Sequence, residues 1–259
     1  MSADGVYTFG DTPTAAHRLA LLADVYEPVS RDLLGRRVPS APAHAVDLGC
    51  GPGHTTRLLH AVTGATRTTG IERSAEYLAI ASAEPVPGVD YLLHDVTDWL
   101  PVQADLIHAR FLLTHLANPQ GAIEVWAAAL RPGGRLVLQE VSRLVSRDPA
   151  LGRYYELVAE LQQLHGQSLD IGARLAELAG RSGLEVEHHA IRELHPGLRS
   201  MAALHVLNLR TWRRDSRAQG AFDDDELDGL DAALVEIAHG RAGAEPIEQD
   251  LAELVLVHP

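Results

Sequence analysis

A glycine-rich turn is the segment of this sequence best suited to bind a ligand. It reads Asp47-Leu48-Gly49-Cys50-Gly51-Pro52-Gly53 and lies between a short apolar run, typical of a buried strand, and a helical pattern. Glycines in such a turn let the backbone approach a ligand closely. A dinucleotide-binding fingerprint would need its third glycine at position 54, where His54 stands, and no G-K-[S/T] follows. The turn therefore favours a ligand without a pyrophosphate.

Two acidic residues further along the chain suit the two halves of a nucleoside. Glu72 ends the second predicted strand, and a carboxylate at that spacing from the turn can accept hydrogen bonds from both hydroxyls of a ribose. Asp95 follows the third predicted strand. It is either an acceptor for an adenine amino group or a surface residue of a turn. Together the turn and the two carboxylates predict an adenosine-type ligand.

These residues need a parallel sheet to bring them together. The predicted strands are residues 45–48, 68–72, 89–94, 104–109 and 135–139, with helices between them over 55–62, up to residue 80, and over 122–130. Such alternation predicts an α/β fold with a Rossmann-like, doubly wound, mostly parallel sheet. The carboxyl ends of its strands would gather the turn and the carboxylates at one edge.

Helical patterns flank this core on both sides. Residues 14–37 predict a pair of short helices divided by Pro28. After the core, helices are predicted over 151–165, 171–182, 198–218 and 224–239, and strands over 184–194 and 251–257. The helices near residues 150 and 200 have no place in a minimal βαβ core, so we interpret them as a cap.

The ordered motifs resemble those of the class I S-adenosylmethionine-dependent methyltransferases, of the bacterial, small-molecule type. The resemblance rests on Asp47–Gly53, then Glu72, then Asp95, and then Leu130-Arg131-Pro132-Gly133-Gly134 before a strand. It implies a seven-stranded sheet whose last strand is antiparallel. It also implies a single methyltransferase domain over residues 1–259, with an N-terminal helical lid (1–40), a cofactor-binding core (44–140) and helical cap segments (145–182 and 197–242).

The resemblance implies S-adenosyl-L-methionine as the cofactor and a role for each residue near it. Asp47 and the backbone from Gly49 to Gly51 would hold the methionyl end, Glu72 the ribose, and Asp95 with Val96 the adenine. The expected cofactor-binding residues are Asp47, Gly49, Cys50, Gly51, Gly53, Glu72, Asp95, Val96, Ala109 and Arg110. Cys50 is expected for its small size and not as a nucleophile. Tyr7 and Phe9 either fold over the cofactor or belong to a disordered tail.

Four residues are candidates for the catalytic step. Methyl transfer from a sulfonium depends largely on holding the acceptor at attack distance and excluding water, but a hydroxyl acceptor also benefits from a general base. His115, after the fourth strand, is the base candidate, or else a packing residue. Glu140, which ends the fifth strand, either orients the substrate or caps the next segment. His165 and His205 lie on apolar helix faces, as pocket walls or as hydrogen-bonded core residues.

Composition narrows the class of protein. The 259 residues carry a formal net charge of −13, with no lysine and 14 histidines, so we expect no binding to nucleic acid. We expect no membrane span or signal peptide, because no apolar run is long enough. One cysteine cannot form an internal disulfide, which favours the cytoplasm. No metal-binding spacing is found, and a homodimer is possible.

The sequence thus predicts methyl transfer from S-adenosylmethionine to a small organic acceptor, in bacterial secondary metabolism. Two alternatives remain open at this point. One is an enzyme that binds S-adenosylmethionine but carries out a cyclisation or another non-methylating reaction. The other is a non-catalytic regulatory protein that retains only the nucleoside pocket.

Overall fold

The computed structural model describes residues 13–259, so Tyr7 and Phe9 of the predicted lid lie outside the described residues. The strands are β1 (His44–Leu48), β2 (Arg67–Glu72), β3 (Val89–Leu93), β4 (Ala104–Arg110), β5 (Leu130–Ser146), β6 (Glu185–Leu194) and β7 (Ile247–Val257). The helices are α1 (Pro13–Arg37), α2 (His54–Thr63), α3 (Ala75–Ser82), α4 (Pro119–Ala128), α5 (Pro149–Leu164), α6 (Leu175–Ala179), α7 (Leu198–Trp212) and α8 (Asp224–Ala238), with 3₁₀ turns η1 (Leu113–His115) and η2 (Ile171–Arg174).

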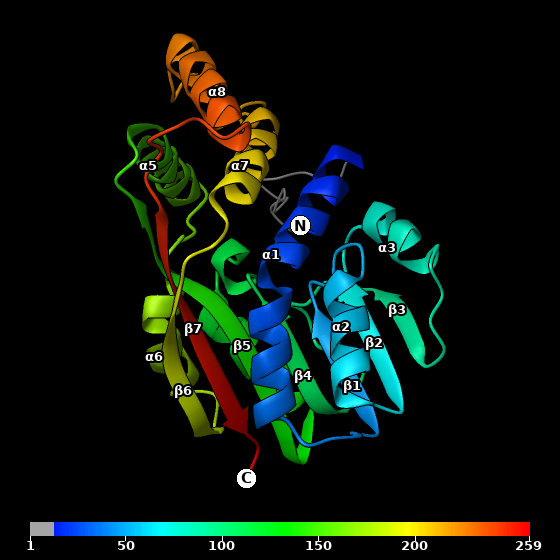
Figure 1. The fold of residues 1–259 in the computed structure, drawn as a ribbon. Helices are drawn as coiled ribbons and strands as arrows, with labels where there is room; N and C mark the ends of the chain where they lie inside the picture. Colours follow the sequence, from blue (N-terminus) through cyan, green and yellow to red (C-terminus); the bar gives the residue numbers. More distant parts are fainter. Residues whose placement is uncertain (1–12) are drawn as a thin grey trace.

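The strands form one seven-stranded sheet in the order β3-β2-β1-β4-β5-β7-β6. Strands β1 to β5 pair in parallel, whereas β7 is antiparallel to both of its neighbours, β5 and β6. This arrangement confirms the predicted Rossmann-like fold and its antiparallel last strand. The carboxyl ends of β1 to β4 therefore meet at one edge, which is the upper edge in Figure 1.

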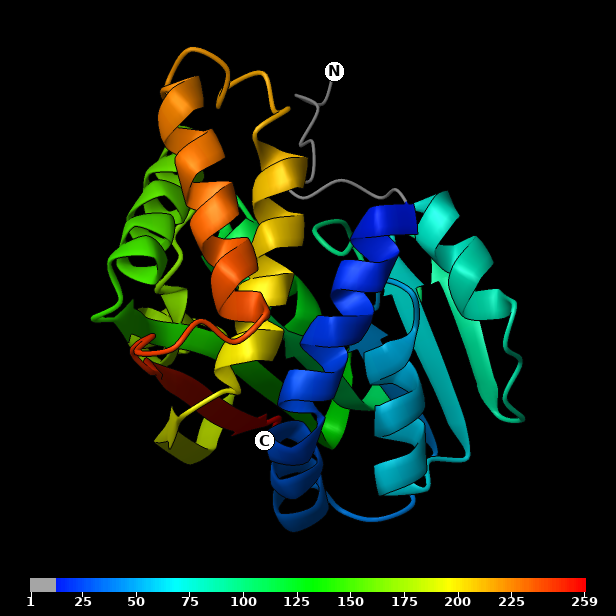
Figure 2. The ribbon, with the colours of Figure 1, turned by 45° about the horizontal axis from the view of Figure 1, so that its top comes forward.

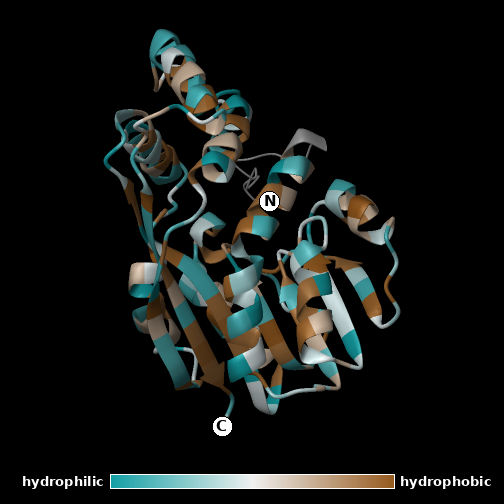
Figure 3. Ribbon diagram, viewed as in Figure 1, coloured by the Kyte–Doolittle hydropathy of each residue, from teal (hydrophilic) through white to brown (hydrophobic). Residues whose placement is uncertain are grey.

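Helices cover both faces of the sheet and bury its apolar residues. On one face Trp126 of α4 and Leu175 of α6 belong to the same buried cluster as Leu138 of β5. On the other face Leu33 of α1 and Leu59 of α2 pack against residues of β1, β4, β5 and β7. Figure 3 shows brown, apolar segments along these strands between the covering helices. Burial of both faces explains why the strands read as nearly continuous apolar runs.

A second hydrophobic cluster lies beyond the carboxyl edge of the sheet. It joins α5, α7 and α8 and includes Tyr154, Leu209, Trp212 and Leu234, with residues from the first half of α1 packed against it. Figures 1 and 2 show these helices standing together above the strand ends. We call this group of α5, α7 and α8 the cap. The helix α6, by contrast, packs on the sheet.

The cap is carried by strands that are longer than the sequence predicts. The predicted fifth strand covers residues 135–139, but β5 runs on to Ser146 and pairs with β7 as far as Ile247. Beyond Gln139, β5 no longer pairs with β4 and continues beside β7 alone. This two-stranded extension was not predicted because its exposed polar side chains give it no continuous apolar run.

The prediction of two helices over residues 14–37 is wrong. The structure has one helix, α1, with Pro28 inside it. Pro28 is exposed, and the carbonyl four residues earlier can bond to water instead of the missing N–H. Similarly, the predicted helix over 171–182 is a 3₁₀ turn, η2, followed by the five-residue α6. Among the helices of residues 13–259, none is long and apolar enough to span a membrane.

Candidate active site

The glycine-rich turn leaves β1 at the carboxyl edge of the sheet and leads into α2. Gly49 has a φ of +61°, and a Cβ atom there would lie 2.7 Å from Cδ1 of Leu112. Gly51 also has a positive φ, +51°, and its N–H donates to Oε2 of Glu72 (3.1 Å). Both the conformation and the crowding exclude a larger residue at position 49. The turn is therefore a cradle of backbone held open by glycine.

Asp47 fixes the base of this turn through protein contacts. Its Oδ2 atom accepts hydrogen bonds from the hydroxyls of Thr55 (2.6 Å) and Thr56 (2.8 Å), at the start of α2. Its Oδ1 atom lies 2.9 Å from Nδ1 of the fully buried His108 in β4. The carboxylate, only 1% exposed, thus ties β1, α2 and β4 together. Its predicted contact with the methionyl end of the cofactor stays a prediction.

Glu72 connects the turn to the start of α3. Besides the Gly51 bond, its Oε1 atom accepts from the backbone N–H groups of Arg73 (2.8 Å) and Ser74 (2.9 Å). A carboxylate oxygen can accept two hydrogen bonds, and Oε2 accepts one from Gly51. The side chain is half-buried at the strand end. Glu72 therefore has capacity for a ligand hydroxyl while its orientation is fixed by backbone donors.

Asp95 and Val96 follow β3 at the same edge. Burial raises the pKa of Asp95, but hydrogen bonds from the hydroxyl and N–H of Thr97 outweigh it, so the net pKa lies below the usual value. The buried Val96 accepts a hydrogen bond at its carbonyl from Nε1 of Trp126 (2.8 Å). Asp95 is consequently an ionised acceptor held in a fixed turn.

The end of β4 contributes Ala109, which is fully buried, and Arg110. Burial lowers the pKa of Arg110 to about 10. The charges of Asp47, Tyr26 and Glu27 act in the opposite direction but are outweighed. Its Nη1 donates to Oγ of Ser30 in α1 (3.0 Å). The next residue, Phe111, has a φ of +54°, which is strained for a residue with a side chain. The chain thus turns sharply where β4 reaches the carboxyl edge.

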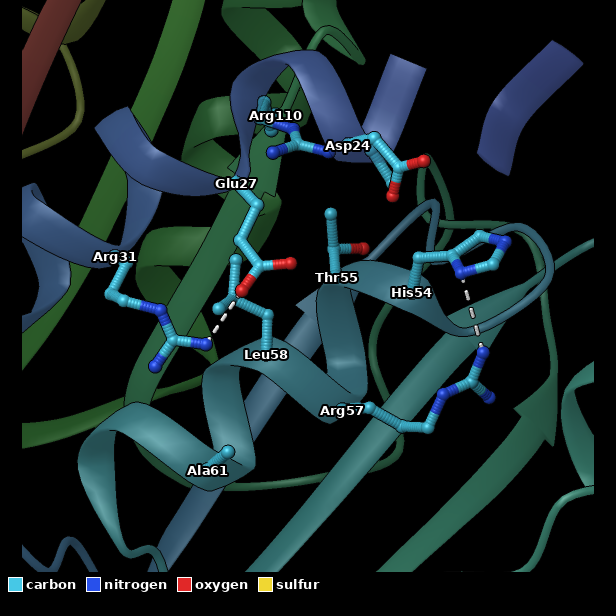
Figure 4. Close-up of a pocket in the computed structure, with 10 residues that line it drawn as sticks. Asp24, Glu27, Arg31, His54, Thr55, Arg57, Leu58, Ala61 and Arg110 are labelled. Atoms are coloured by element: carbon cyan, nitrogen blue, oxygen red, sulfur yellow. Dashed lines mark hydrogen bonds and ion pairs between the residues drawn. The ribbon is translucent and has the colours of Figure 1, made fainter. Parts of the chain in front are cut away.

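A hollow of about 290 Å³ opens between α1 and α2 beside this turn. Figure 4 shows acidic side chains of α1 and basic side chains of α2 and β4 around it. Its lining residues are Ala23, Asp24, Glu27, Arg31, His54, Thr55, Arg57, Leu58, Ala61 and Arg110. Of these residues, only Arg110 was predicted from the sequence as part of the site. The helical spacing of Asp24, Glu27 and Arg31, which places them on one face of α1, was the available signal.

Glu140, at the carboxyl edge on β5, is fully buried. Its Oε1 atom accepts from the N–H groups of Leu112 (2.8 Å) and Leu113 (2.7 Å), so the carboxyl group caps η1. Its Oε2 atom has no hydrogen-bond partner among the described residues. Burial raises the pKa of Glu140 to about 8, although these N–H groups act in the opposite direction. At pH 7 the group is therefore largely a neutral acid.

His115 lies in η1, close to the cap. Burial lowers its pKa to about 3, and the charges of Arg18 and Arg73 add to the shift. Its carbonyl accepts from Nε2 of Gln167 (2.8 Å), in the segment that follows α5. A histidine with so low a pKa is a weak base near neutral pH. Its position at the mouth of the carboxyl edge matches the prediction, but its basicity does not favour the predicted role.

The two cap histidines have different surroundings. His205, on α7, is 3% exposed; its Nε2 lies 3.0 Å from the hydroxyl of Tyr155, and burial lowers its pKa to about 3. His165, at the end of α5, lies between Asp215 (3.2 Å) and Arg217 (3.3 Å). Both ring nitrogens of His165 are thus engaged in joining α5 to the segment after α7. The structure therefore brings His205, but not His165, into the buried interior of the cap.

The thiol of Cys50 lies buried in the glycine-rich turn. Burial raises the pKa of the Cys50 thiol well above its usual value, and Asp47 and Glu72 add to the shift. A thiol of this kind is a poor nucleophile. Within residues 13–259 there is no group of three or more His, Cys, Asp or Glu side chains placed to hold a metal ion.

A polar pair that was not predicted from the sequence joins α1 to β7. Tyr26 donates a hydrogen bond to Oε1 of Gln249 (2.6 Å), across 223 residues of chain. The Tyr26 ring also packs edge-on against Phe111, with centroids 4.7 Å apart. Nothing in the local pattern marks either residue, since each reads as part of an ordinary helix or strand.

Comparisons with known proteins fit this geometry. Residues 16–189 match a family model described as a methyltransferase domain. A trans-aconitate 2-methyltransferase of Paracidovorax citrulli is 38% identical over 113 residues, which cover 42% of this chain and 43% of that relative. One from Azoarcus sp. is 30% identical over 203 residues, which cover 66% of this chain and 80% of the relative.

A solved structure shows the same fold. Phosphoethanolamine N-methyltransferase 2 of Haemonchus contortus, in complex with phosphomonomethylethanolamine and S-adenosylhomocysteine, superposes with a TM-score of 0.59 at 16% identity. The match covers 93% of this chain and 57% of that one. Because the family model spans well over half of the sequence, the chain belongs to the methyltransferase-domain family, with the fold of the class I S-adenosylmethionine-dependent methyltransferases.

Proposed function

We propose that the protein transfers a methyl group from S-adenosylmethionine to a small organic acid held between the carboxyl edge of the sheet and the cap. The observation that carries this proposal is Glu72, which backbone N–H groups orient beside the glycine cradle while one oxygen keeps capacity for a ribose hydroxyl. The proposed setting in bacterial secondary metabolism rests on the lysine-free composition alone.

The described residues fit the cofactor in shape and charge. Glu72 would hold the ribose and Asp95 the adenine, while the glycine turn leaves backbone close to the methionyl chain. The hollow between α1 and α2 offers Asp24 and Arg110, charges of both signs that a zwitterionic methionyl group needs. When bound, S-adenosylmethionine supplies an activated methyl group on a cationic sulfonium.

The pKa values of His115, His205 and Glu140 favour an acceptor that is already ionised. His115 and His205 have pKa values near 3, so neither is suited to deprotonate a hydroxyl at neutral pH. Glu140 also keeps its proton at neutral pH, because burial raises its pKa to about 8. A carboxylate acceptor needs no base, because it is already ionised at pH 7. The names of the trans-aconitate 2-methyltransferase relatives support an acid as the acceptor.

Transfer of the methyl group to a carboxylate requires no proton transfer. An oxygen of the acceptor carboxylate forms a bond to the methyl carbon as the carbon–sulfur bond breaks. The electron pair of that bond stays on sulfur, and the products are a methyl ester and S-adenosylhomocysteine. The chain's part is to position the acceptor and exclude water. The cap, whose helices share an apolar cluster packed against α1, is suited to both tasks.

Two other functions differ from methyl transfer in what happens to the bound cofactor, and experiment can distinguish them. A cyclase or other non-methylating enzyme would bind the cofactor and leave it unconsumed. A regulatory protein would bind it without any turnover. Both share the contacts of Glu72 and Asp95, so the cofactor site does not separate them from a methyltransferase.

Replacing Glu72 with alanine tests the cofactor assignment. We expect the affinity for S-adenosylhomocysteine, measured by titration calorimetry, to fall by about 1–3 kcal/mol, because a charged hydrogen-bond partner is lost. Glu76→Ala is the matched control, since Glu76 is an exposed carboxylate in the first turn of α3. Equal affinities of Glu72→Ala and the unmodified protein would show that the ribose assignment is wrong.

A further inference from the structure

Two tyrosine hydroxyls at the junction of cap and sheet each hold a polar side chain in one orientation. Tyr26 of α1 donates to Oε1 of Gln249 in β7 (2.6 Å). Tyr155 of α5 lies 3.0 Å from Nε2 of His205 in α7. Gln249 is 1% exposed and His205 3% exposed, so water does not satisfy their remaining polar atoms from outside. Each pair joins an element of the cap or of α1 to a different part of the chain.

The remaining polar atom of each pair is a donor. Burial keeps His205 neutral, so one of its two ring nitrogens carries a proton. Within residues 13–259 the buried Tyr155 hydroxyl has no other hydrogen-bond partner, so we assign its proton to the bond with Nε2 of His205 and the ring proton to Nδ1. Gln249 accepts through Oε1, which leaves its NH₂ group as a donor. Neither Nδ1 of His205 nor Nε2 of Gln249 has a partner within residues 13–259. Buried donors without acceptors destabilise a fold, so each is expected to serve a ligand.

The two pairs lie near each other and near the expected reaction centre. Leu22 and Val25 of α1 pack both against the cluster that contains Tyr155 and against the one that contains Tyr26, so the two tyrosines belong to adjoining clusters. Tyr26 also packs on Phe111, at the strained turn where β4 ends. One turn beyond His205, Asn208 accepts a hydrogen bond from the buried Arg18 (3.3 Å). Donors and a cation therefore converge from α1, α7 and β7.

A ligand that satisfies such a set must present acceptor atoms and negative charge. The nearby carboxyl of Glu140 is largely protonated at neutral pH and does not oppose an anion. We propose that His205 Nδ1 and Gln249 Nε2 bind a second carboxylate of the acceptor, so that the substrate is a di- or tricarboxylic acid of which one carboxylate is methylated. This inference rests on the proposed methyl transfer. It adds that His205 and Gln249 select acids that carry a second carboxylate.

The first test compares acids that differ in their number of carboxylates. The protein, saturated with S-adenosylhomocysteine, is titrated calorimetrically with trans-aconitate, citrate and fumarate, and with crotonate as the monocarboxylate control. We expect at least one of the first three to bind tenfold or more tightly than crotonate. Equal binding of crotonate, or no binding of any polycarboxylate up to 10 mM, roughly the weakest affinity of use to an enzyme, overturns the proposal.

The second test uses variants that alter one donor at a time. Gln249→Glu keeps the acceptor for Tyr26 but replaces the donor with a negative group, and His205→Gln removes the donor at the Nδ1 position. Each is expected to raise KM or Kd for the bound acid about tenfold or more, with the affinity for S-adenosylhomocysteine unchanged. His205→Asn, whose amide nitrogen matches Nδ1, is expected to restore much of the binding.

Tyr154→Phe is the matched control for these variants. It removes a buried hydroxyl in the same helix as Tyr155 and keeps the ring stacked on His205, with ring centroids 4.4 Å apart. Circular dichroism and thermal unfolding establish that each variant is folded. Unchanged KM and Kd in both folded donor variants contradict the inference alone. Methyl transfer to no acid, despite tight polycarboxylate binding, contradicts the proposed function alone.

Discussion

Burial, more than residue type, determines what each candidate side chain can do. Glu72 and Asp95 remain at the edge of the sheet, where backbone donors orient them. Their position could be predicted from the sequence, because Glu72 ends one strand and Asp95 follows another. His115 and His205 could be identified by position, but their lowered pKa values depend on the cap that covers them. The pairing of Tyr26 with Gln249 could not be predicted, since 223 residues separate the partners.

Glu140 provides a prediction at this scale through the pH dependence of stability. Its pKa is about 8 in the folded protein and near 4.5 in the unfolded chain, so the folded state holds the extra proton between these values. The contribution of Glu140 to stability is then complete below pH 4.5 and is lost as the pH rises through 8. Glu140→Gln, which mimics the neutral acid, should remove this loss.

Urea unfolding of both proteins between pH 5 and 8 measures this effect. We expect the free energy of unfolding of the variant, minus that of the unmodified protein, to increase as the pH rises. The buried histidines, whose pKa values are lowered, change the stability in the opposite direction with pH. Their contribution is the same in both proteins and is therefore absent from the difference between the two free energies. Parallel pH profiles would mean that Glu140 is ionised in the folded protein.

Among the elements, those with local signals were predicted and those set by distant packing were not. Strands β1 to β4 and their helices follow from apolar runs and turn residues. The extension of β5 to Ser146 depends on β7, whose partner residues lie about a hundred positions later in the chain. The single helix α1 persists through Pro28 because Tyr26, Val29 and Leu33 on either side are buried against the sheet. Tertiary packing here outweighs a local helix breaker.

Replacing Pro28 with alanine should therefore stabilise α1. The proline is exposed and costs a backbone hydrogen bond, whereas alanine restores the N–H. We expect the free energy of unfolding to rise by about 1–2 kcal/mol, after allowing for the greater freedom of the unfolded chain. Urea denaturation at constant pH is the measurement. A loss of stability would indicate that Tyr26 and its neighbours require the geometry that Pro28 imposes.

Across the whole molecule, the sheet supplies a cofactor site and the cap supplies an enclosure. The cluster that holds α5, α7 and α8 together also contacts α1, so one helix connects the enclosure to the sheet. Figure 2 shows α1 running from the lower end of the sheet to the cap. The net charge of −13 lies mostly on the surface, while Arg18 and Arg110 are placed inward. Arg18 thereby lies beside the proposed acid site, through its bond to Asn208, and Arg110 lines the hollow proposed for the methionyl group.

The central claim is that the protein moves the methyl group of its cofactor to an acid. The direct measurement is incubation with S-adenosylmethionine labelled in the methyl group and with trans-aconitate, followed by separation of the products, with Glu72→Ala as the control. We expect label in a methyl ester and an equal amount of S-adenosylhomocysteine, both greatly reduced in the variant. Cofactor that is bound but not consumed, with either an unlabelled, rearranged product or no product from any acid, would contradict it.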